Sequence, residues 1–166
     1  SFVPIIRKET GSLLKTLVAM KRPRRILEVG TAVGYSALLM AQSMPSGAHI
    51  TTIEKYQPRI VAAKENFRLA GMEDAITLME GDADKVLEQL SGTFDFIFMD
   101  PPYRMDLPKK VLEALKDTCL ADEETLIIAE EALDVDFSWA GALGYEIVKI
   151  KEYKTNKHVF LKIKKV

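Results

Sequence analysis

Short apolar runs alternate with amphipathic segments along most of the chain. In the segment that begins at Lys8, Leu13, Leu14, Leu17 and Val18 recur at helical spacing. The same patterns predict strands at 24–29, 50–53, 76–79, 94–99 and 125–129, helices at 8–20, 35–44, 58–71, 85–90, 107–118 and 137–143, and a closing hairpin with strands at 145–153 and 158–164.

This repeated strand-then-helix order predicts an α/β protein. Strands joined by helices run parallel, and the helices cover both faces of the sheet. We therefore expect one domain over residues 1–166, with a Rossmann-like, doubly wound, mostly parallel seven-stranded sheet. The closing hairpin should add an antiparallel C-terminal strand.

Composition narrows the class of protein. The 166 residues are 48% hydrophobic and 28% charged, with a net charge of −1, which is typical of a globular domain. No apolar run is long enough to span a membrane, so we expect a cytoplasmic protein without a membrane partner. The single Cys119 excludes an internal disulfide, and two histidines with one cysteine cannot make the usual zinc sites.

Positive charge is concentrated in the last 22 residues of the sequence. Residues 145–166 contain seven lysines against Glu146 and Glu152. This excess fits a surface that faces RNA, but it also fits an edge hairpin whose lysines prevent aggregation. The sequence leaves both interpretations open.

The most informative motif follows the first strand and runs from Glu28 to Ser36. Gly30 and Gly34 predict a tight strand-to-helix turn that brings backbone close to a ligand. The turn lacks the G-x-G-x-x-G spacing of dinucleotide-binding loops, which argues against a nicotinamide cofactor. Glu28 ends the strand, where its carboxylate could meet the ammonium group of a methionine moiety.

Acidic residues also end the next two strands. Glu54 is placed to hold ribose hydroxyls, and Asp82 to accept a hydrogen bond from an adenine amino group. Asp82 could instead only cap the following helix. Together with Glu28 they predict S-adenosylmethionine as the cofactor. The other residues that we assign to this site are Gly30, Thr31, Gly34, Ser36, Lys55, Gly81, Ala83 and Asp100.

A second motif, Asp100-Pro101-Pro102-Tyr103, follows the strand at 94–99. The Asp100 carboxylate and the Pro101 carbonyl can accept the hydrogens of an exocyclic base amine, and Tyr103 can stack on the extruded base. The two prolines stiffen the turn. We therefore predict Asp100, Pro101 and Tyr103 as catalytic residues, although such a tetrapeptide can also be only a turn at the end of a strand.

At these motifs the chain resembles class I S-adenosylmethionine-dependent methyltransferases. Residues 3–100, with Val3-Pro4-Ile5-Ile6-Arg7-Lys8-Glu9-Thr10 and the 28–36 motif, resemble bacterial O-methyltransferases related to catechol O-methyltransferase. A tRNA branch of these enzymes methylates 5-hydroxyuridine. Residues 94–166, with Asp100-Pro101-Pro102-Tyr103 and the ending at 151–161, resemble 16S rRNA guanine-N2 methyltransferases. The resemblance thus implies a chimera with a seam near 94–101.

The resemblance also implies competing functions. The O-methyltransferases use a divalent cation held in part by an Asp-Asn pair after the fifth strand, where this chain has Glu130-Glu131, so we predict no metal. The leading hypothesis is methylation of an exocyclic guanine nitrogen in RNA, with rRNA or tRNA as partner. One alternative is O-methylation of a tRNA or small-molecule hydroxyl. The other is an engineered chimera that binds the cofactor without turnover. The sequence assigns no oligomeric state.

Overall fold

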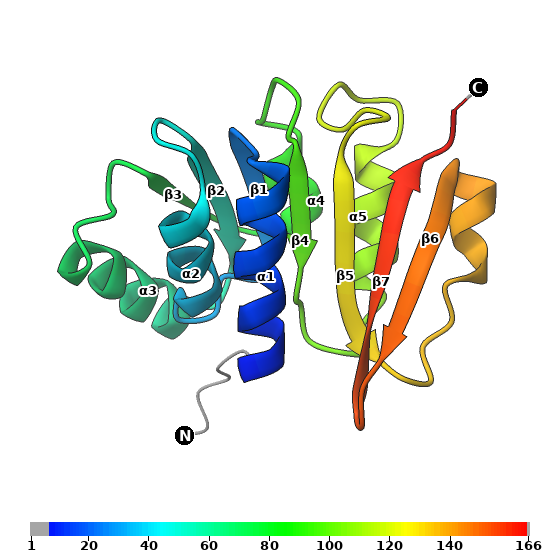
Figure 1. Cartoon of the computed structure of the whole chain (residues 1–166), viewed down its shortest axis with the longest axis horizontal. Helices are drawn as coiled ribbons and strands as arrows, with labels where there is room; N and C mark the ends of the chain where they lie inside the picture. The colour runs from blue at the N-terminus through cyan, green and yellow to red at the C-terminus, as the bar shows by residue number, and fades with distance from the viewer. Residues whose placement is uncertain (1–6, 166) are drawn as a thin grey trace.

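The computed structural model describes residues 7–165. Residues 3–6 of the resemblance to O-methyltransferases lie outside this range. Figure 1 shows one sheet of seven strands in the order β3-β2-β1-β4-β5-β7-β6. The strands are β1 (Arg25–Val29), β2 (His49–Glu54), β3 (Ile76–Glu80), β4 (Phe96–Met99), β5 (Leu126–Ala132), β6 (Tyr145–Glu152) and β7 (Asn156–Ile163). The helices are α1 (Lys8–Lys21), α2 (Tyr35–Ser43), α3 (Gln57–Leu69), α4 (Ala83–Leu87), α5 (Leu107–Leu115) and the 3₁₀ helix η1 (Ser138–Leu143).

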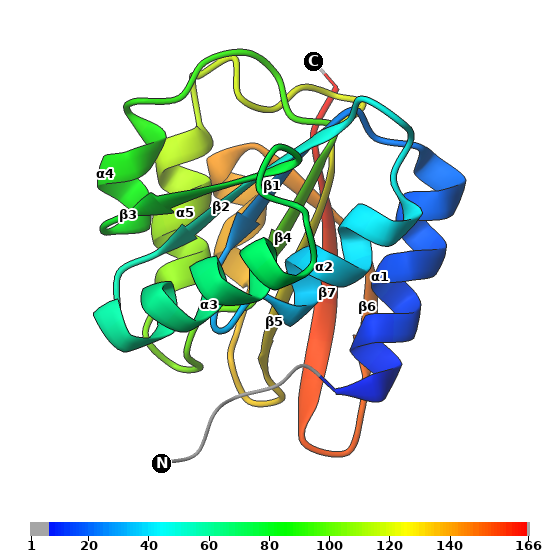
Figure 2. The same ribbon diagram turned by 90° about the vertical axis from the view of Figure 1, so that its left-hand side faces the viewer.

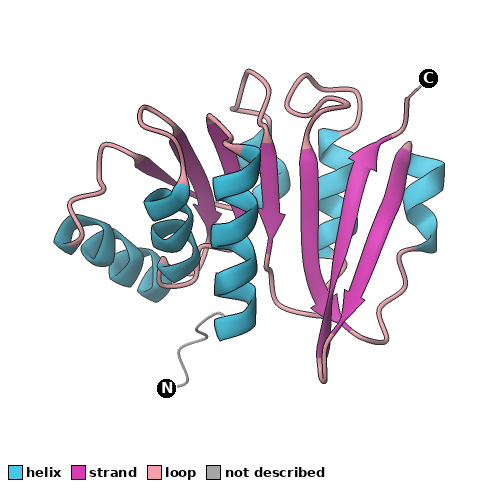
Figure 3. Ribbon diagram, viewed as in Figure 1, coloured by secondary structure: helices cyan, strands magenta, loops and turns pink. Residues whose placement is uncertain are grey.

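The sheet confirms the predicted fold class. Strands β1 to β5 pair in parallel, and β7 pairs antiparallel with both β5 and β6 (Figure 3). The order reverses between β1 and β4, which places the topological switch point at the carboxyl ends of these two strands. Within the part of the chain that the structure describes, no helix is long and apolar enough to cross a membrane.

Helices cover both faces of the sheet and create two cores (Figure 2). Successive residues of a strand point to opposite faces of the sheet and so enter different cores. In β1, Ile26 belongs to the core formed with α1, α2 and α3, and Leu27 belongs to the core formed with α4, α5 and η1. Both side chains are fully buried. The central strand β4 is apolar on both faces, as expected for a parallel sheet between two helical layers.

Several element ends differ from the predictions by one to three residues, and two of them have a clear local reason. The helix α5 ends at Leu115 rather than at residue 118, because the Thr118 hydroxyl donates to the Leu115 carbonyl and closes the last turn. The strand β5 continues to Ala132 rather than stopping at residue 129, because Ala132 still pairs with Asn156 of β7. Glu130 and Glu131 therefore lie within a strand, on opposite faces of the sheet.

Candidate active site

A cavity of about 710 Å³ opens at the carboxyl ends of β1, β2 and β4. It brings together residues from both sequence motifs. The predicted site residues that line it are Gly30, Thr31, Ser36, Glu54, Lys55, Gly81, Asp82, Ala83, Asp100, Pro101 and Tyr103. Two predicted residues, Glu28 and Gly34, do not line it.

The two motifs touch at Gly30. This residue has a φ of +96°, and a Cβ built on it would lie 2.6 Å from the Asp100 carbonyl oxygen. Its amide donates to the Ile53 carbonyl at 3.0 Å, which ties the loop to β2. Only glycine tolerates both the backbone conformation and the close approach. The start of the first motif therefore lies against the start of the second.

Gly34 has a structural role instead of the predicted contact with cofactor. Its φ is +95°, and a Cβ built on it would lie 2.6 Å from the Phe67 ring of α3. The glycine lets α2 begin directly against that ring. Its importance therefore lies in packing one helix against another, behind the cavity wall.

Glu54 is fixed at the cavity wall by backbone amides. Its Oε1 accepts the Ala32 amide at 2.9 Å, and its Oε2 accepts the Lys55 and Tyr56 amides at 3.1 and 3.2 Å. The residue is 9% exposed. Three converging N–H donors stabilise the carboxylate and set its direction, so it is preorganised as an acceptor for ligand hydroxyls.

Glu28 lies beneath the cavity rather than on its wall, which corrects the predicted contact with an ammonium group. It is fully buried and accepts hydrogen bonds from the Ser36 hydroxyl and, at 2.7 Å, from the Thr52 hydroxyl. Burial raises the pKa of Glu28 to about 7, although these two hydrogen bonds act in the opposite direction. Ser36 thus lines the cavity, but its hydroxyl donates to the buried Glu28 beneath it.

Asp82 precedes α4 at the mouth of the cavity. Its carboxylate pairs with the Lys55 ammonium group at 3.0 Å, and the two side chains are 60% and 65% exposed. The Asp82 side chain makes no capping hydrogen bond to α4. Asp82 therefore occupies the N-cap position of α4, but its side chain does not cap the helix and can face a ligand as well as Lys55.

The second motif ends in a buried polar cluster. The Tyr103 hydroxyl donates to Glu130 Oε2 at 2.8 Å. Burial, and then the charge of Glu130, raise the pKa of Tyr103. Burial also raises the pKa of Asp100 well above its usual range, and the neighbouring Glu130 raises it further. Asp100 therefore holds a proton far more tightly than an ordinary aspartate.

Sequence reasoning did not place Glu130, Arg7 or His158 at this site. Glu130 and Arg7 line the cavity, and His158 lies 2.8 Å from Glu130. Glu130 and His158 are 28 residues apart in sequence, and they become neighbours because β5 pairs antiparallel with β7. The nearest signal was the unusual pair of acids inside an apolar strand.

These residues do not fit a divalent-cation site. Glu130 already accepts from Tyr103 and His158, and Glu131 turns its Oε1 to the Arg104 and Ala132 amides at 3.0 and 2.9 Å. Such a cation needs several carboxylate or carbonyl oxygens directed at one point. Among residues 7–165, no group of three or more histidine, cysteine or acidic side chains is arranged to hold a metal.

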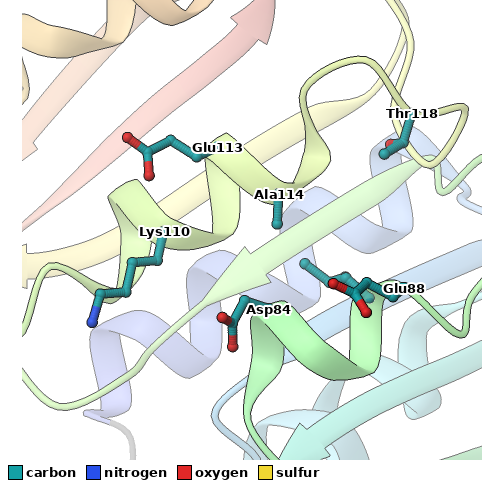
Figure 4. A pocket seen from close by; sticks show the side chains of 7 residues that line it. Asp84, Glu88, Lys110, Glu113, Ala114 and Thr118 are labelled. Carbon is teal, nitrogen blue, oxygen red and sulfur yellow. The ribbon is translucent and has the colours of Figure 1, made fainter.

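A smaller groove of about 350 Å³ lies between α4 and α5 (Figure 4). It is lined by Asp84, Glu88, Glu113 and Lys110, and it shares Asp84 and Lys110 with the large cavity. None of the predicted cofactor residues reaches it. The large cavity, at the switch point of the sheet, is therefore the candidate active site.

The fold and the cavity define an α/β protein that binds a nucleotide cofactor at the ends of parallel strands. Residues 4–127 match the family model described as O-methyltransferase. A catechol O-methyltransferase from Niastella koreensis is 37% identical over 101 residues, which cover 56% of this chain and 45% of the relative. Catechol O-methyltransferase from Sus scrofa is 28% identical over 133 residues, 77% of this chain and 70% of the relative. An O-methyltransferase from Bacillus cereus, in complex with SAH, has a TM-score of 0.79 at 21% identity, over 98% of this chain and 84% of that one.

This chain belongs to the O-methyltransferase family, because the family match covers well over half of it. This family membership agrees with the predicted enzyme class, and the Bacillus cereus structure in complex with SAH agrees with the predicted cofactor. The match runs through the predicted seam at 94–101 without a break, and the comparisons give no support to a separate rRNA methyltransferase segment. The chain spans less than half the length of the Niastella koreensis relative.

Proposed function

We propose that this protein transfers the methyl group of S-adenosylmethionine to a hydroxyl oxygen of a small acceptor bound beside Asp100. The observation that carries the proposal is the position of a buried carboxyl, with a raised pKa, at the junction of the two motifs. Membership of the O-methyltransferase family supports oxygen as the atom that receives the methyl group.

The residues of the chain divide the work. The cofactor supplies an activated methyl group when it is bound. Glu54 would hold its ribose hydroxyls, and the loop at Gly30 would direct the methionine end toward Asp100. Pro101 and Tyr103 would enclose the acceptor, since both line the cavity next to Asp100. Asp100 would take the hydroxyl proton as the oxygen becomes bonded to carbon, and positioning would supply much of the rate.

Methylation of an exocyclic guanine nitrogen in RNA is the second candidate. Its specific support is that Asp100, Pro101, Pro102 and Tyr103 all lie on the cavity wall, as a motif that presents a planar amine requires. The lysines of the β6–β7 hairpin would then face the RNA backbone. An rRNA or tRNA partner and a cytoplasmic location belong to this proposal.

A transfer assay with labelled S-adenosylmethionine separates the candidates. Catechol and a short guanine-containing RNA hairpin serve as acceptors, each with magnesium and with a chelator. We expect transfer to catechol that survives chelation. Transfer to the RNA alone would favour the second candidate, and binding of S-adenosylhomocysteine without transfer to either would indicate a chain that binds the cofactor without turnover.

A further inference from the structure

The start of α1 lies beside the acceptor side of the cavity. Arg7 precedes this helix in an extended conformation, with φ −65° and ψ 151°, and its carbonyl oxygen accepts the Gly11 amide at 2.9 Å. In the first turn, the Thr10 hydroxyl donates to Glu130 Oε1 of β5 at 3.1 Å. Thr10 is buried, so this contact fixes the first turn of the helix on the sheet. The backbone of Arg7 is therefore held at a defined place next to Glu130.

A second contact directs the side chain of Arg7. Its guanidinium donates to the hydroxyl of Thr155, which lies in the turn between β6 and β7. Figure 1 shows the start of α1 and this turn at the same edge of the sheet as the carboxyl ends of β4 and β5. Arg7 lines the cavity there, together with Asp100, Tyr103 and Glu130. The guanidinium is thus held between α1 and the β6–β7 hairpin, at the acceptor side of the cavity.

The charge of Arg7 acts on this side of the cavity. Among residues 7–165, its guanidinium makes no ion pair, and the Thr155 hydroxyl that it contacts is uncharged. Burial and the charge of Glu130 raise the pKa of Tyr103, and the charge of Arg7 acts in the opposite direction. The field of the guanidinium therefore reaches the Tyr103 hydroxyl, where the acceptor is proposed to bind.

The other cations of the cavity wall come from different elements. They are Lys55, Arg59, Lys85 and Lys110. Lys55 is paired with Asp82 at 3.0 Å, on the cofactor side. The guanidinium of Arg59 lies over the Tyr56 ring at the start of α3, 5.5 Å from its centroid. Lys85 belongs to α4, and Lys110 of α5 also lines the groove between these two helices. Arg7 is therefore the cation that α1 places at the acceptor side.

A guanidinium in this position suits a carboxylate on the acceptor. Its planar fork of N–H donors matches the two oxygens of a carboxylate, and such charge-assisted hydrogen bonds are stronger than neutral ones. The nearby carboxyl groups of Asp100 and Glu130 disfavour a second anion at this place unless a cation compensates for it. Binding of an anionic acceptor therefore depends on Arg7 to a greater degree than binding of a neutral one.

We propose that Arg7 determines acceptor specificity by binding a carboxylate, and that the preferred acceptor is a small hydroxyl compound that also carries this group. The inference rests on the proposed function. The reacting hydroxyl of the acceptor faces Asp100, and its carboxylate binds the guanidinium, which Thr155 keeps in position. The carboxylate takes no part in the transfer of the methyl group. Arg7 therefore holds the substrate and the transition state about equally, so its loss should raise KM more than it lowers kcat.

The test compares two catechols of nearly the same shape. Homoprotocatechuate carries an acetate group, and its primary amide is neutral; the methylene group insulates the ring hydroxyls from this change. We expect the wild type to prefer the acid over the amide in kcat/KM by about tenfold at neutral pH, since the ion pair is strong but partly open to solvent. In Arg7→Gln, which keeps an N–H donor without the charge, this ratio should fall to about one.

Lys8→Gln is the matched control. Lys8 is the next residue, is exposed like Arg7 and does not line the cavity, so this variant removes the same charge from the same place in the chain. Its ratio of acid to amide should equal that of the wild type. Equal ratios in the wild type and in Arg7→Gln would overturn the inference and leave the proposed function intact. Equal falls in Arg7→Gln and Lys8→Gln would also overturn it, because net charge alone would then explain the preference.

Binding without turnover gives a second readout. In calorimetric titration of the protein saturated with S-adenosylhomocysteine, the Kd for homoprotocatechuate should be about tenfold weaker in Arg7→Gln than in the wild type. Thermal unfolding identifies a variant that fails to fold. A folded Arg7→Gln that loses affinity for S-adenosylhomocysteine instead would assign the guanidinium to the carboxylate of the cofactor. Transfer to the RNA hairpin alone, weakened in Arg7→Gln, would assign it to a phosphate. Either result would overturn the inference, whereas failure of the wild type on every acceptor would count against the proposed function.

Discussion

The two halves of the cavity are built in different ways. On the cofactor side, Glu54 is held by amides no more than 22 residues away in sequence, and the backbone supplies every donor. On the acceptor side, Glu130 is held by side chains 27, 28 and 120 residues away. The carboxylate on the cofactor side is thus positioned by backbone groups that are near it in sequence. The acceptor side is a tertiary assembly of titratable groups.

This difference has a physical consequence for mutation. A carboxylate fixed by backbone amides keeps its surroundings when a neighbouring side chain changes. A carboxyl pair fixed by side chains changes its proton distribution when any member is lost. Variants on the cofactor side should therefore alter affinity, and variants on the acceptor side should alter rate and pH dependence.

The largest effect is expected at Asp100. Asp100→Asn removes the group that we propose as the proton acceptor, so transfer should fall by about 10³-fold, near the upper part of the range for acid–base catalysis. S-adenosylhomocysteine binding should change only a few fold. Asp106→Asn is the control, because Asp106 is exposed on the same loop and does not line the cavity. Equal losses in both variants would mean that the loop, and not the carboxyl, limits transfer.

The contact between the two halves is tested at Gly30. In Gly30→Ala the new methyl group would lie 2.6 Å from the Asp100 carbonyl oxygen at a φ of +96°. We expect a loss of about 3 kcal/mol in the free energy of unfolding, together with weaker cofactor binding. Gly47→Ala is matched, with a φ of +83° and nothing within 4 Å, and should lose only about 1 kcal/mol. Similar losses in urea unfolding would show that backbone strain alone, without the clash, accounts for the effect.

Glu28 gives a prediction about stability and pH. Its pKa is about 7 in the folded protein against an ordinary value of 4.5. The folded state binds the extra proton, so stability is greatest below pH 4.5 and falls as pH rises to 7, by about 3 kcal/mol. Glu28→Gln should therefore match the wild type in urea unfolding at low pH and exceed it at pH 8. Parallel curves for the two proteins would show that the pKa of Glu28 is not raised.

The contrast between the halves also explains what the sequence could predict. The strands, the helices and the glycine turn follow from local patterns, because apolar periodicity and φ preferences act over a few residues. Glu54 was predictable, since it ends a strand beside the loop that it contacts. The position of Glu28 was not, because a strand-end acid can point into the cavity or beneath it. The pair of Glu130 with His158 depended on the register of β5 with β7, which no local pattern specifies.

A moderate effect on affinity is expected at Glu54. Glu54→Ala leaves three backbone amides without their acceptor and removes the proposed partner of the ribose hydroxyls. Binding of S-adenosylhomocysteine should weaken by about 1–3 kcal/mol in calorimetric titration. Glu80→Ala is the control, because Glu80 ends the neighbouring strand but does not line the cavity. An unchanged affinity for Glu54→Ala would remove Glu54 from the ribose role.

The smallest effect is expected at Asp82. The carboxylate is 60% exposed and already paired with Lys55, so a hydrogen bond to an adenine amino group would be screened by solvent. Asp82→Asn should weaken S-adenosylhomocysteine binding by less than about 1 kcal/mol. An analogue of S-adenosylhomocysteine with hydrogen in place of the 6-amino group should bind the variant and the wild type alike, because it offers no donor to Asp82 at that position. A loss of equal size for both ligands would mean that Asp82 acts through Lys55 and the shape of the cavity mouth, and that the adenine amino group is recognised elsewhere.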